Sequence, residues 1–275
     1  MAKVRLDVLL VEKKLIETRE KAKRVIMAGL VFSEQQRLDK PGMKVDETIP
    51  LTVKGKLIPY VGRGGLKLEK ALNHFSISVK NKIMVDVGSS TGGFTDCALQ
   101  NGATLSYAID VGYNQLAWKL RSDERVIVME RTNFRYVTPE MLQKGIPDFA
   151  TIDVSFISLK LILPVLKQLL AENSDVIALI KPQFEAGRDQ VGKKGIVRDK
   201  KVHLAVLSRI ISYALSEGYQ LFDVTYSPIT GGDGNIEFLA HFGWKHEKVG
   251  ITVTDDELSQ VVDEAHRNFT EVNKP

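Results

Sequence analysis

The chain has 275 residues, of which 44% are hydrophobic and 26% charged, and its formal net charge is +4. This composition predicts a globular protein of one large or two unequal domains with a sizeable core. The single cysteine, Cys97, excludes an intrachain disulfide and a cysteine metal cluster, and we expect no metal site. The sequence shows neither a signal peptide nor an apolar stretch long enough to span a bilayer. We therefore expect a cytoplasmic protein that does not contact membranes.

Positive charge is concentrated at the start of the chain. Residues 1–60 hold 13 Lys and Arg against 8 Asp and Glu, a net charge of +5, whereas the remainder carries −1. A basic module ahead of a near-neutral body indicates a domain that binds a polyanion and presents it to a catalytic domain. A solvated basic face without a partner is the alternative that charge alone leaves open.

Short elements are expected within these first 60 residues. They are, in order, helices over Arg5–Leu15 and Arg19–Ala28 and strands over Val31–Ser33 and Glu47–Val53. Thr18 is suited to cap the second helix and Gly29 to end it. Arg19 and Lys23 lie one turn apart on that helix, so the sequence predicts that they face phosphates together.

Three motifs in this region resemble one RNA-binding module. They are R-L-D-x-L-L, T-R-E-K-A-K-R-x-I-x-A-G-L-V and K-P-G-M-K-V, spread over residues 3–55. Together they resemble the alpha-L module of a small-subunit ribosomal protein, many pseudouridine synthases and tyrosyl-tRNA synthetases. The resemblance implies that a small α+β domain over residues 1–56 binds RNA. The residues expected to contact RNA are Arg5, Arg19, Lys23, Arg24 and, within a linker over residues 57–66, Arg63.

The stretch from Lys82 to Asp96 predicts a ligand-binding loop. Ile83–Val87 is short, apolar and β-branched, as in a strand buried on both faces of a parallel sheet. The loop G-S-S-T-G-G that follows combines glycines, which let backbone approach a ligand, with hydroxyls beside a helix N-terminus. Serine at its third position departs from the dinucleotide fingerprint G-x-G-x-x-G, which favours S-adenosylmethionine over a nicotinamide cofactor. A tight turn without a ligand is the alternative.

Two further positions suit a nucleoside cofactor. Asp110 ends the expected strand Leu105–Ile109, where S-adenosylmethionine enzymes commonly bind the ribose hydroxyls with an acidic residue. Asn133, shortly after the third strand, is the candidate for the adenine. The full set of residues expected to bind S-adenosylmethionine is Asp86, Gly88, Ser89, Ser90, Thr91, Gly92, Gly93, Phe94, Asp110 and Asn133.

Expected strands and helices alternate regularly beyond the loop, which predicts an α/β fold with a doubly wound, mostly parallel sheet. The intervening helices include Gln115–Arg121, Pro139–Lys144 and Leu159–Ala171. Tyr219–Ser227 and Ile236–Phe242 are joined by T-G-G-D-G-N as in a hairpin, so the last strand is expected to run antiparallel. The glycine-rich loop Gln183–Val197, with its lysines and arginine, is either a basic lid over substrate or a plain loop.

Four charged residues fall where a doubly wound sheet binds ligands, outside the carboxyl ends of its strands. Asp153 and Lys181 end the fourth and fifth strands, Glu237 lies in the last strand, and Lys67 lies on the helix before the first. Each alone also fits a surface or capping role. Together they resemble the Lys-Asp-Lys-Glu tetrad of RrmJ/FtsJ-type ribose 2′-O-methyltransferases. We expect Lys181 to accept the proton, Lys67 to hold the 2′-oxygen, and the two carboxylates to orient the amines.

Over residues 3–243 the chain resembles the TlyA family, often labelled haemolysin A. The motifs are Y-V-G-R-G-G-L-K-L-E, D-V-G-S-S-T-G-G-F-T-D, D-V-S-F-I-S-L and L-I-K-P-Q-F-E. The resemblance implies S-adenosylmethionine-dependent 2′-O-methylation of a cytidine ribose in ribosomal RNA or ribosomal subunits. The Rossmann-like methyltransferase domain would cover residues 67–245, followed by a tail over 246–275 with an expected helix over Asp255–Phe269. No obligate protein partner is evident. The alternatives are a membrane-active haemolysin and a nicotinamide-dependent oxidoreductase.

Overall fold

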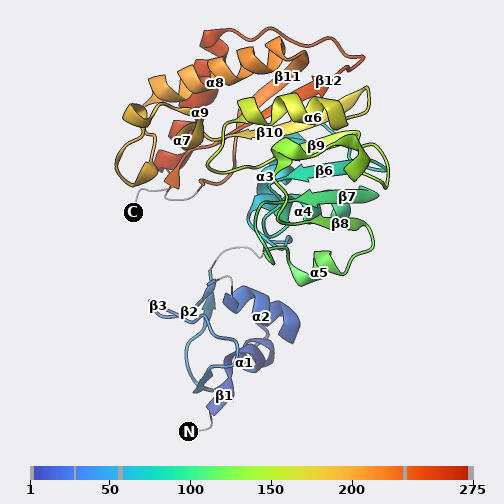
Figure 1. Cartoon of the computed structure of the whole chain (residues 1–275). Coiled ribbons are helices and arrows are strands. Elements are labelled where there is room, and N and C mark those ends of the chain that lie inside the picture. The colour runs from blue at the N-terminus through green and yellow to red at the C-terminus, as the bar shows by residue number, and fades with distance from the viewer. Residues whose placement is uncertain (1–2, 28, 55–57, 232–233, 272–275) are drawn as a thin grey trace. The chain divides into compact units, whose positions relative to one another are not determined.

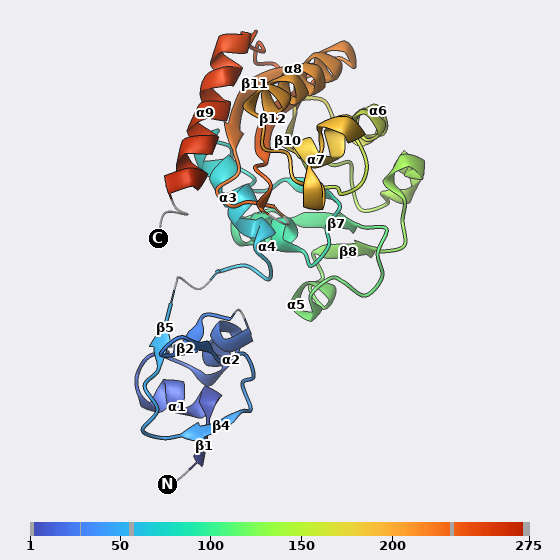
Figure 2. The same cartoon turned by 90° about the vertical axis from the view of Figure 1, so that its left-hand side faces the viewer.

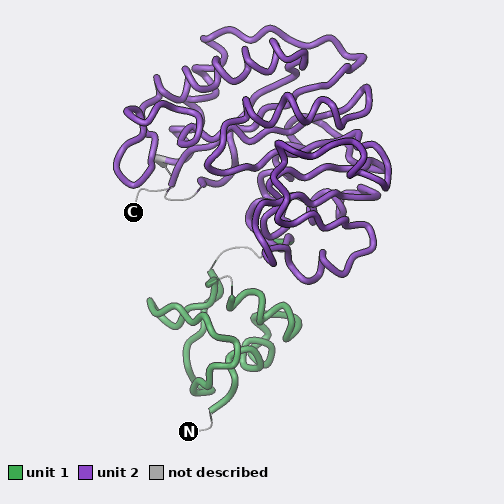
Figure 3. The backbone as a smooth tube through the Cα atoms, viewed as in Figure 1, with its two compact units in different colours: residues 1–59 green, residues 60–275 purple. Residues whose placement is uncertain are grey.

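The computed structural model describes residues 3–27, 29–54, 58–231 and 234–271. The chain forms two compact units, residues 1–59 and 60–275 (Figure 3). The boundary between the units falls within the predicted linker over residues 57–66, whose first residue lies outside the described part of the chain. The domain limits at residues 56 and 67 stay predictions. Within the described ranges, no helix is both long and apolar enough to cross a membrane.

The first unit combines two helices with two small antiparallel sheets (Figure 1). Its elements are β1 (Lys3–Arg5), α1 (Leu6–Glu12), α2 (Arg19–Met27), β2 (Val31–Ser33), β3 (Gln36–Arg37), β4 (Lys44–Asp46) and β5 (Thr52–Val53). β1 pairs with β4, and β2 lies between β3 and β5. Leu6, Leu9 and Leu10 of α1 pack with Val25 and Ile26 of α2, because their spacing places them on one face of each helix.

Two predicted elements of this unit are wrong in extent. The first helix ends at Glu12, and Leu15, which was counted within it, is exposed. The predicted strand Glu47–Val53 is replaced by β4 and β5 with a turn between them. The Asp46 carboxylate accepts hydrogen bonds from the backbone N–H and hydroxyl of Thr48, and this local bonding ends the strand before it can continue.

A seven-stranded sheet with helices on both faces forms the second unit (Figures 1 and 2). Its strands are β6 (Ile83–Val87), β7 (Leu105–Ile109), β8 (Val126–Met129), β9 (Phe149–Ile152), β10 (Ser174–Ile180), β11 (Tyr219–Tyr226) and β12 (Phe238–Trp244). Their spatial order is β11-β12-β10-β9-β6-β7-β8. β12 runs antiparallel to both of its neighbours, and the other paired strands run parallel. The predicted doubly wound sheet with an antiparallel last strand is confirmed.

The helices of this unit position the edge where the site lies. They are α3 (Gly64–His74), α4 (Gly93–Gln100), α5 (Trp118–Arg121), α6 (Leu163–Leu169), α7 (Pro182–Glu185), α8 (Lys200–Ser216) and α9 (Asp255–Glu271). α6 and α8 contribute side chains to the apolar core that they form with the strands of the sheet, and α4 contacts β6 and β7. α9 contacts α8 and β11 and buries Leu258, Val262 and Ala265 in the same core. The C-terminal helix is therefore an integral part of the second unit.

Three predicted helices of this unit are wrong in extent. Gln115–Arg121 shrinks to α5, because Ala117 is extended, with ψ 139°, and its backbone N–H donates to the Thr91 carbonyl at 3.1 Å. Pro139–Lys144 is a single 3₁₀ turn over Pro139–Met141. Leu159–Ala171 divides into a 3₁₀ turn over Leu159–Leu161 and α6, whose first turn contains Pro164; proline cannot donate the N–H that a continuous helix would need there.

Candidate active site

The loop after β6 is shaped for close approach by a ligand. Gly88 has φ +83°, and a Cβ there would lie 2.5 Å from the carbonyl oxygen of Asp153, so only glycine fits. Ser90, with φ +47°, donates its backbone N–H to the Asp110 carboxylate at 2.7 Å, and Gly112 N–H donates to the other oxygen at 2.7 Å. Asp110 is thus held rigidly at the end of β7 and retains free lone pairs. The remaining lone pairs can accept hydrogen bonds from hydroxyl groups, and the predicted contact with a ribose stays a prediction.

A cavity of about 580 Å³ opens at the carboxyl ends of β6, β9 and β10. This size is ordinary for a small-molecule site. The predicted cofactor residues that line it are Gly88, Ser89, Ser90, Thr91, Gly93 and Phe94. Asp86, Gly92, Asp110 and Asn133 lie outside its lining. The cofactor roles of both groups stay predictions.

The outlying cofactor candidates make structural contacts. Asp86 is fully buried beneath the loop, where it accepts hydrogen bonds from Thr95 and Thr151, and burial raises the pKa of its carboxyl group to about 6. Gly92 has φ +92° and packs against the side chain of Leu120. Asn133 caps a 3₁₀ turn by accepting a backbone hydrogen bond at 3.2 Å.

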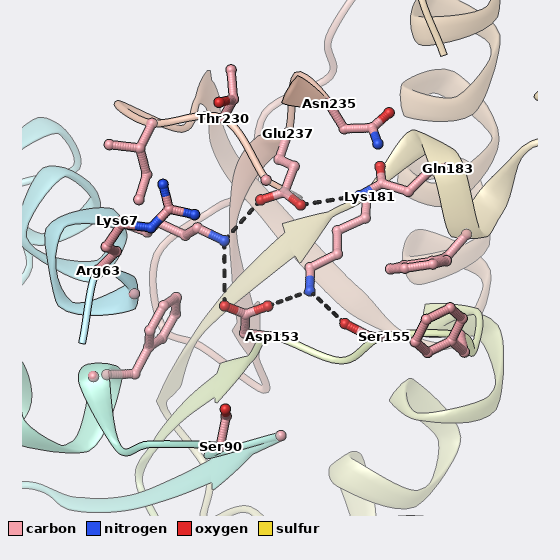
Figure 4. A pocket seen from close by; sticks show the side chains of 18 of the residues that line it. Arg63, Lys67, Ser90, Asp153, Ser155, Lys181, Gln183, Thr230, Asn235 and Glu237 are labelled. Carbon is pink, nitrogen blue, oxygen red and sulfur yellow. Dashed lines mark hydrogen bonds and ion pairs between the residues drawn. The ribbon is translucent and has the colours of Figure 1, made fainter. Parts of the chain in front are cut away.

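The four predicted catalytic residues meet in this cavity, as Figure 4 shows. Lys67 Nζ lies 2.8 Å from Glu237 Oε2 and 3.5 Å from Asp153 Oδ2. The other oxygen of Asp153 lies 2.5 Å from Lys181 Nζ. Asp153 therefore bridges the two amines, and residues from α3 and from the ends of β9, β10 and β12 form one connected network.

Because the charged side chains of this network are largely buried, water screens the attraction between them only weakly. Lys67 and Lys181 are each 8% exposed and Glu237 is 2% exposed. Burial alone would lower the pKa of Lys67, but attraction to Asp153 and Glu237 outweighs it and raises that pKa above its ordinary value. Lys67 is thus held as an ammonium ion, whereas Lys181 faces one carboxylate and the hydroxyl of Ser155 at 3.1 Å.

Sequence reasoning did not find two polar residues that support the tetrad. Gln183 Nε2 donates to Glu237 Oε1 at 3.1 Å, so both oxygens of that buried carboxylate have donors. Ser155 Oγ lies against Lys181 (Figure 4). Each follows a residue of the tetrad by two positions in the chain. A polar residue two positions after the end of a strand is the only feature of the sequence that points to Ser155 and Gln183. Such residues are too common for this spacing to identify a functional role.

Two aromatic rings lie at the entrance of the cavity and were also missed. Phe156 is 91% exposed and has φ +64°, a conformation that a non-glycine residue adopts at a cost of about 1 kcal/mol or more. Its ring centroid lies 4.8 Å from that of Phe184. A large apolar side chain held in water by a strained backbone indicates a surface for stacking a planar ligand.

Most of the predicted RNA-binding residues lie in the first unit. Arg5 and Arg19 both donate to the buried carboxylate of Asp7 at 3.0 Å, and hydrogen bonds from Arg5 and Arg19 lower the pKa of Asp7 to about 2. Asp7 thereby fixes two half-exposed guanidinium groups. Lys23 pairs with Glu20, and Arg24 donates to a backbone carbonyl. Arg63 lines the catalytic cavity of the second unit instead.

Comparison with known proteins identifies the family and the fold. Residues 60–244 match the FtsJ-like methyltransferase model, and residues 4–48 match the S4 domain. The Bacillus subtilis protein YqxC, provisionally named as an rRNA methyltransferase, is 67% identical over 98% of this chain and 96% of its own. The Mycobacterium tuberculosis 16S/23S rRNA (cytidine-2′-O)-methyltransferase TlyA is 39% identical over 98% of each chain. The chain belongs to the TlyA family of FtsJ-like methyltransferases.

A solved structure agrees with this assignment. The Streptococcus thermophilus protein, provisionally named as a haemolysin, is 50% identical, covers the whole of both chains and superposes with a TM-score of 0.79. As a TlyA-family methyltransferase the chain uses S-adenosylmethionine, and the nicotinamide alternative is set aside. The glycine loop, the fixed Asp110 carboxylate and the adjoining cavity fit that cofactor. The S4 domain is the alpha-L RNA-binding module that the sequence resembles.

Proposed function

We propose that this methyltransferase modifies the 2′-hydroxyl of a cytidine ribose in ribosomal RNA. The observation that carries the proposal is the buried Lys67-Asp153-Lys181-Glu237 network next to the glycine loop. A ribose hydroxyl is a very weak acid, so its reaction at neutral pH needs a proton acceptor beside the oxygen. The names of the relatives support ribosomal RNA and cytidine as the substrate.

The two lysines have different roles in this proposal. Lys67, held as an ammonium ion between Asp153 and Glu237, donates a hydrogen bond to the 2′-oxygen and stabilises its developing negative charge. Lys181 acts as the neutral amine, whose Nζ lone pair takes the hydroxyl proton to give the ammonium ion, while Asp153 and Ser155 aim that nitrogen at the cavity. Bound S-adenosylmethionine supplies an electrophilic methyl group; the loop residues and Asp110 would hold it.

Other residues of the chain would present the RNA. Phe156, exposed at the entrance beside Phe184, offers a face on which the target base can stack. Arg5 and Arg19 of the S4 domain offer guanidinium groups to phosphates. Ribosomal subunits are the form of substrate that we propose. An enzyme acting on them works where they assemble, so we propose a cytoplasmic location.

The test is transfer of radiolabelled methyl from S-adenosylmethionine to small and large ribosomal subunits that lack the modification. We expect label in RNA with the wild-type protein and a loss of at least a hundredfold with Lys181→Ala. Cofactor binding, measured separately by calorimetry, should be retained in both proteins. Absence of label in RNA from either subunit, with the cofactor bound, would contradict the proposed substrate.

A further inference from the structure

A basic turn at the cavity entrance has no role in the chemistry described above. The segment 186–199, between α7 and α8, carries Arg188, Lys193, Lys194 and Arg198 against two aspartates. All four cationic side chains are exposed. In the described part of the chain, none of the four forms an ion pair, whereas Lys21 and Lys23 on α2 do. These charges are therefore available to an external anion.

Side chains hold this turn in place from two directions. Asn235, only 3% exposed, donates from Nδ2 to the Gly195 carbonyl at 3.0 Å and accepts from Val197 N–H at 3.1 Å. His203 of α8 also contacts the Val197 carbonyl, at 3.2 Å. The turn also closes on itself, since Gly195 N–H donates to the Gly192 carbonyl at 3.1 Å. The turn loses its conformational entropy when the protein folds. Less entropy is therefore lost when an anion binds the two lysines.

Backbone strain marks the same place. Lys194 has φ +64° and ψ 20°, the left-handed region in which glycine or asparagine is usual, and glycine follows it at φ +71°. A lysine retained there, at a cost of about 1 kcal/mol or more, points to a use for its side chain. Lys194 lines both the catalytic cavity and a neighbouring hollow formed with Lys193 and Arg198.

The chemistry of the substrate indicates what these charges meet. In RNA the 2′-oxygen is on the carbon next to the one that carries the 3′-phosphodiester. A pocket that receives a 2′-hydroxyl therefore always brings a phosphate group to its entrance. Two exposed ammonium groups beside the catalytic cavity are complementary to that charge.

We propose that the Lys193-Lys194 turn binds the phosphodiester flanking the target ribose and that Asn235 is the positioning residue that fixes the turn. Asn235 lies two residues before Glu237, so one short segment of the chain both contacts the phosphate-binding turn and contributes a residue to the tetrad. The inference rests on the proposed function, because the phosphate is placed by 2′-O chemistry. It is a second RNA contact, within the methyltransferase unit.

The test compares Lys194→Gly and Lys193→Glu with Lys80→Glu as the control. Lys194→Gly suits the left-handed backbone and so removes the charge without disturbing the turn. Lys80 is also exposed but precedes β6, at the edge of the sheet away from the site. We expect each turn variant to raise the KM for subunit RNA at least fivefold with kcat within twofold of wild type. The slope of log(kcat/KM) against log salt should fall by about 0.7 for each lost contact.

Asn235→Ala tests the positioning role. It should raise the RNA KM as Lys194→Gly does, and the two substitutions combined should be no worse than either alone, because Asn235 acts through the turn. Additive losses, or a loss confined to kcat, would overturn the role of Asn235. An unchanged KM and salt slope in Lys194→Gly would overturn the phosphate contact. The contact would also be overturned if Lys194→Gly bound S-adenosylmethionine more weakly and RNA as tightly as the wild type.

Failure of this inference is distinguishable from failure of the proposed function. Binding of a fluorescent single-stranded RNA oligonucleotide, followed by anisotropy across salt concentrations, needs no methyl transfer. If the wild-type protein methylates no ribose, the proposed function fails, and a reduced salt slope in the turn variants would then support only a contact between the turn and an RNA phosphate, without assigning it to a target ribose. If the wild-type protein methylates RNA and every turn variant binds and reacts as it does, only the phosphate contact is refuted.

Discussion

Replacing Lys181 separates its two possible roles, proton acceptor and simple positive charge. Lys181→Arg keeps a cation that can pair with Asp153, but a guanidinium stays protonated at any pH a protein tolerates and cannot accept a proton. Lys181→Met removes the charge at similar length. If Lys181 is the acceptor, both variants should fail; if its charge alone matters, Lys181→Arg should keep most of the activity.

The expected size of the loss follows from the contacts. A positioned general base contributes about 10²–10⁴-fold, or roughly 3–5 kcal/mol of activation free energy at 1.36 kcal/mol per tenfold. Ser155→Ala removes one hydrogen bond to the same amine, which is worth about 1.5 kcal/mol and so about tenfold. We therefore expect both Lys181 variants to fall well below Ser155→Ala.

The assay is single-turnover methyl transfer with protein and S-adenosylmethionine both saturating over RNA. Lys67 still pairs with Asp153 when Lys181 is replaced, so the fold should persist; thermal unfolding and cofactor binding provide the control. A Lys181→Arg protein within tenfold of wild type would refute the proton-acceptor role. A reversed order, with Lys67→Met far worse than Lys181→Met, would exchange the roles of the two lysines.

Three further outcomes are expected. Gln183→Leu removes a donor to Glu237 and should lower kcat about tenfold with cofactor affinity unchanged; an unaltered kcat would contradict its supporting role. Burial lowers the pKa of His203 to about 4, so the unfolded state binds more protons between pH 6.5 and 4, and the unfolding free energy should fall there by on the order of 3 kcal/mol as pH decreases. Urea titrations should show that fall in the wild type and a smaller one in His203→Gln. Asp7→Asn should weaken RNA binding severalfold at low salt by freeing the Arg19 guanidinium, whereas equal binding at every salt concentration would contradict that function.

Much of the sheet and the tetrad could be predicted because each signal was local. Ile83–Val87 is an apolar run followed by glycines, and it forms the buried β6 as expected. Asp153 and Lys181 were conspicuous because a charged residue directly follows each buried strand. In a parallel sheet those strand ends share one edge. The grouping of both residues with Lys67 and Glu237 came from the resemblance to the Lys-Asp-Lys-Glu tetrad.

What could not be predicted depends on contacts between distant segments. Asn235 donates a hydrogen bond to the Gly195 carbonyl from 40 residues further along the chain, and nothing near it in the sequence indicates that partner. Phe156 reads as an apolar core residue, yet its positive φ turns the ring into solvent. The helix predicted over Gln115–Arg121 begins only at Trp118 because Ala117 is extended and its N–H donates to the carbonyl of Thr91, a residue distant in the sequence.

The chemical identity of the methylated nucleoside tests the central claim most directly. Subunit RNA treated with the protein and S-adenosylmethionine would be digested to nucleosides and analysed by mass spectrometry, with alkaline hydrolysis of the intact RNA in parallel. The account predicts 2′-O-methylcytidine and one alkali-resistant linkage at the modified position, both lost with Lys181→Arg. A methyl group on a base, with every linkage still cleaved by alkali, would contradict it.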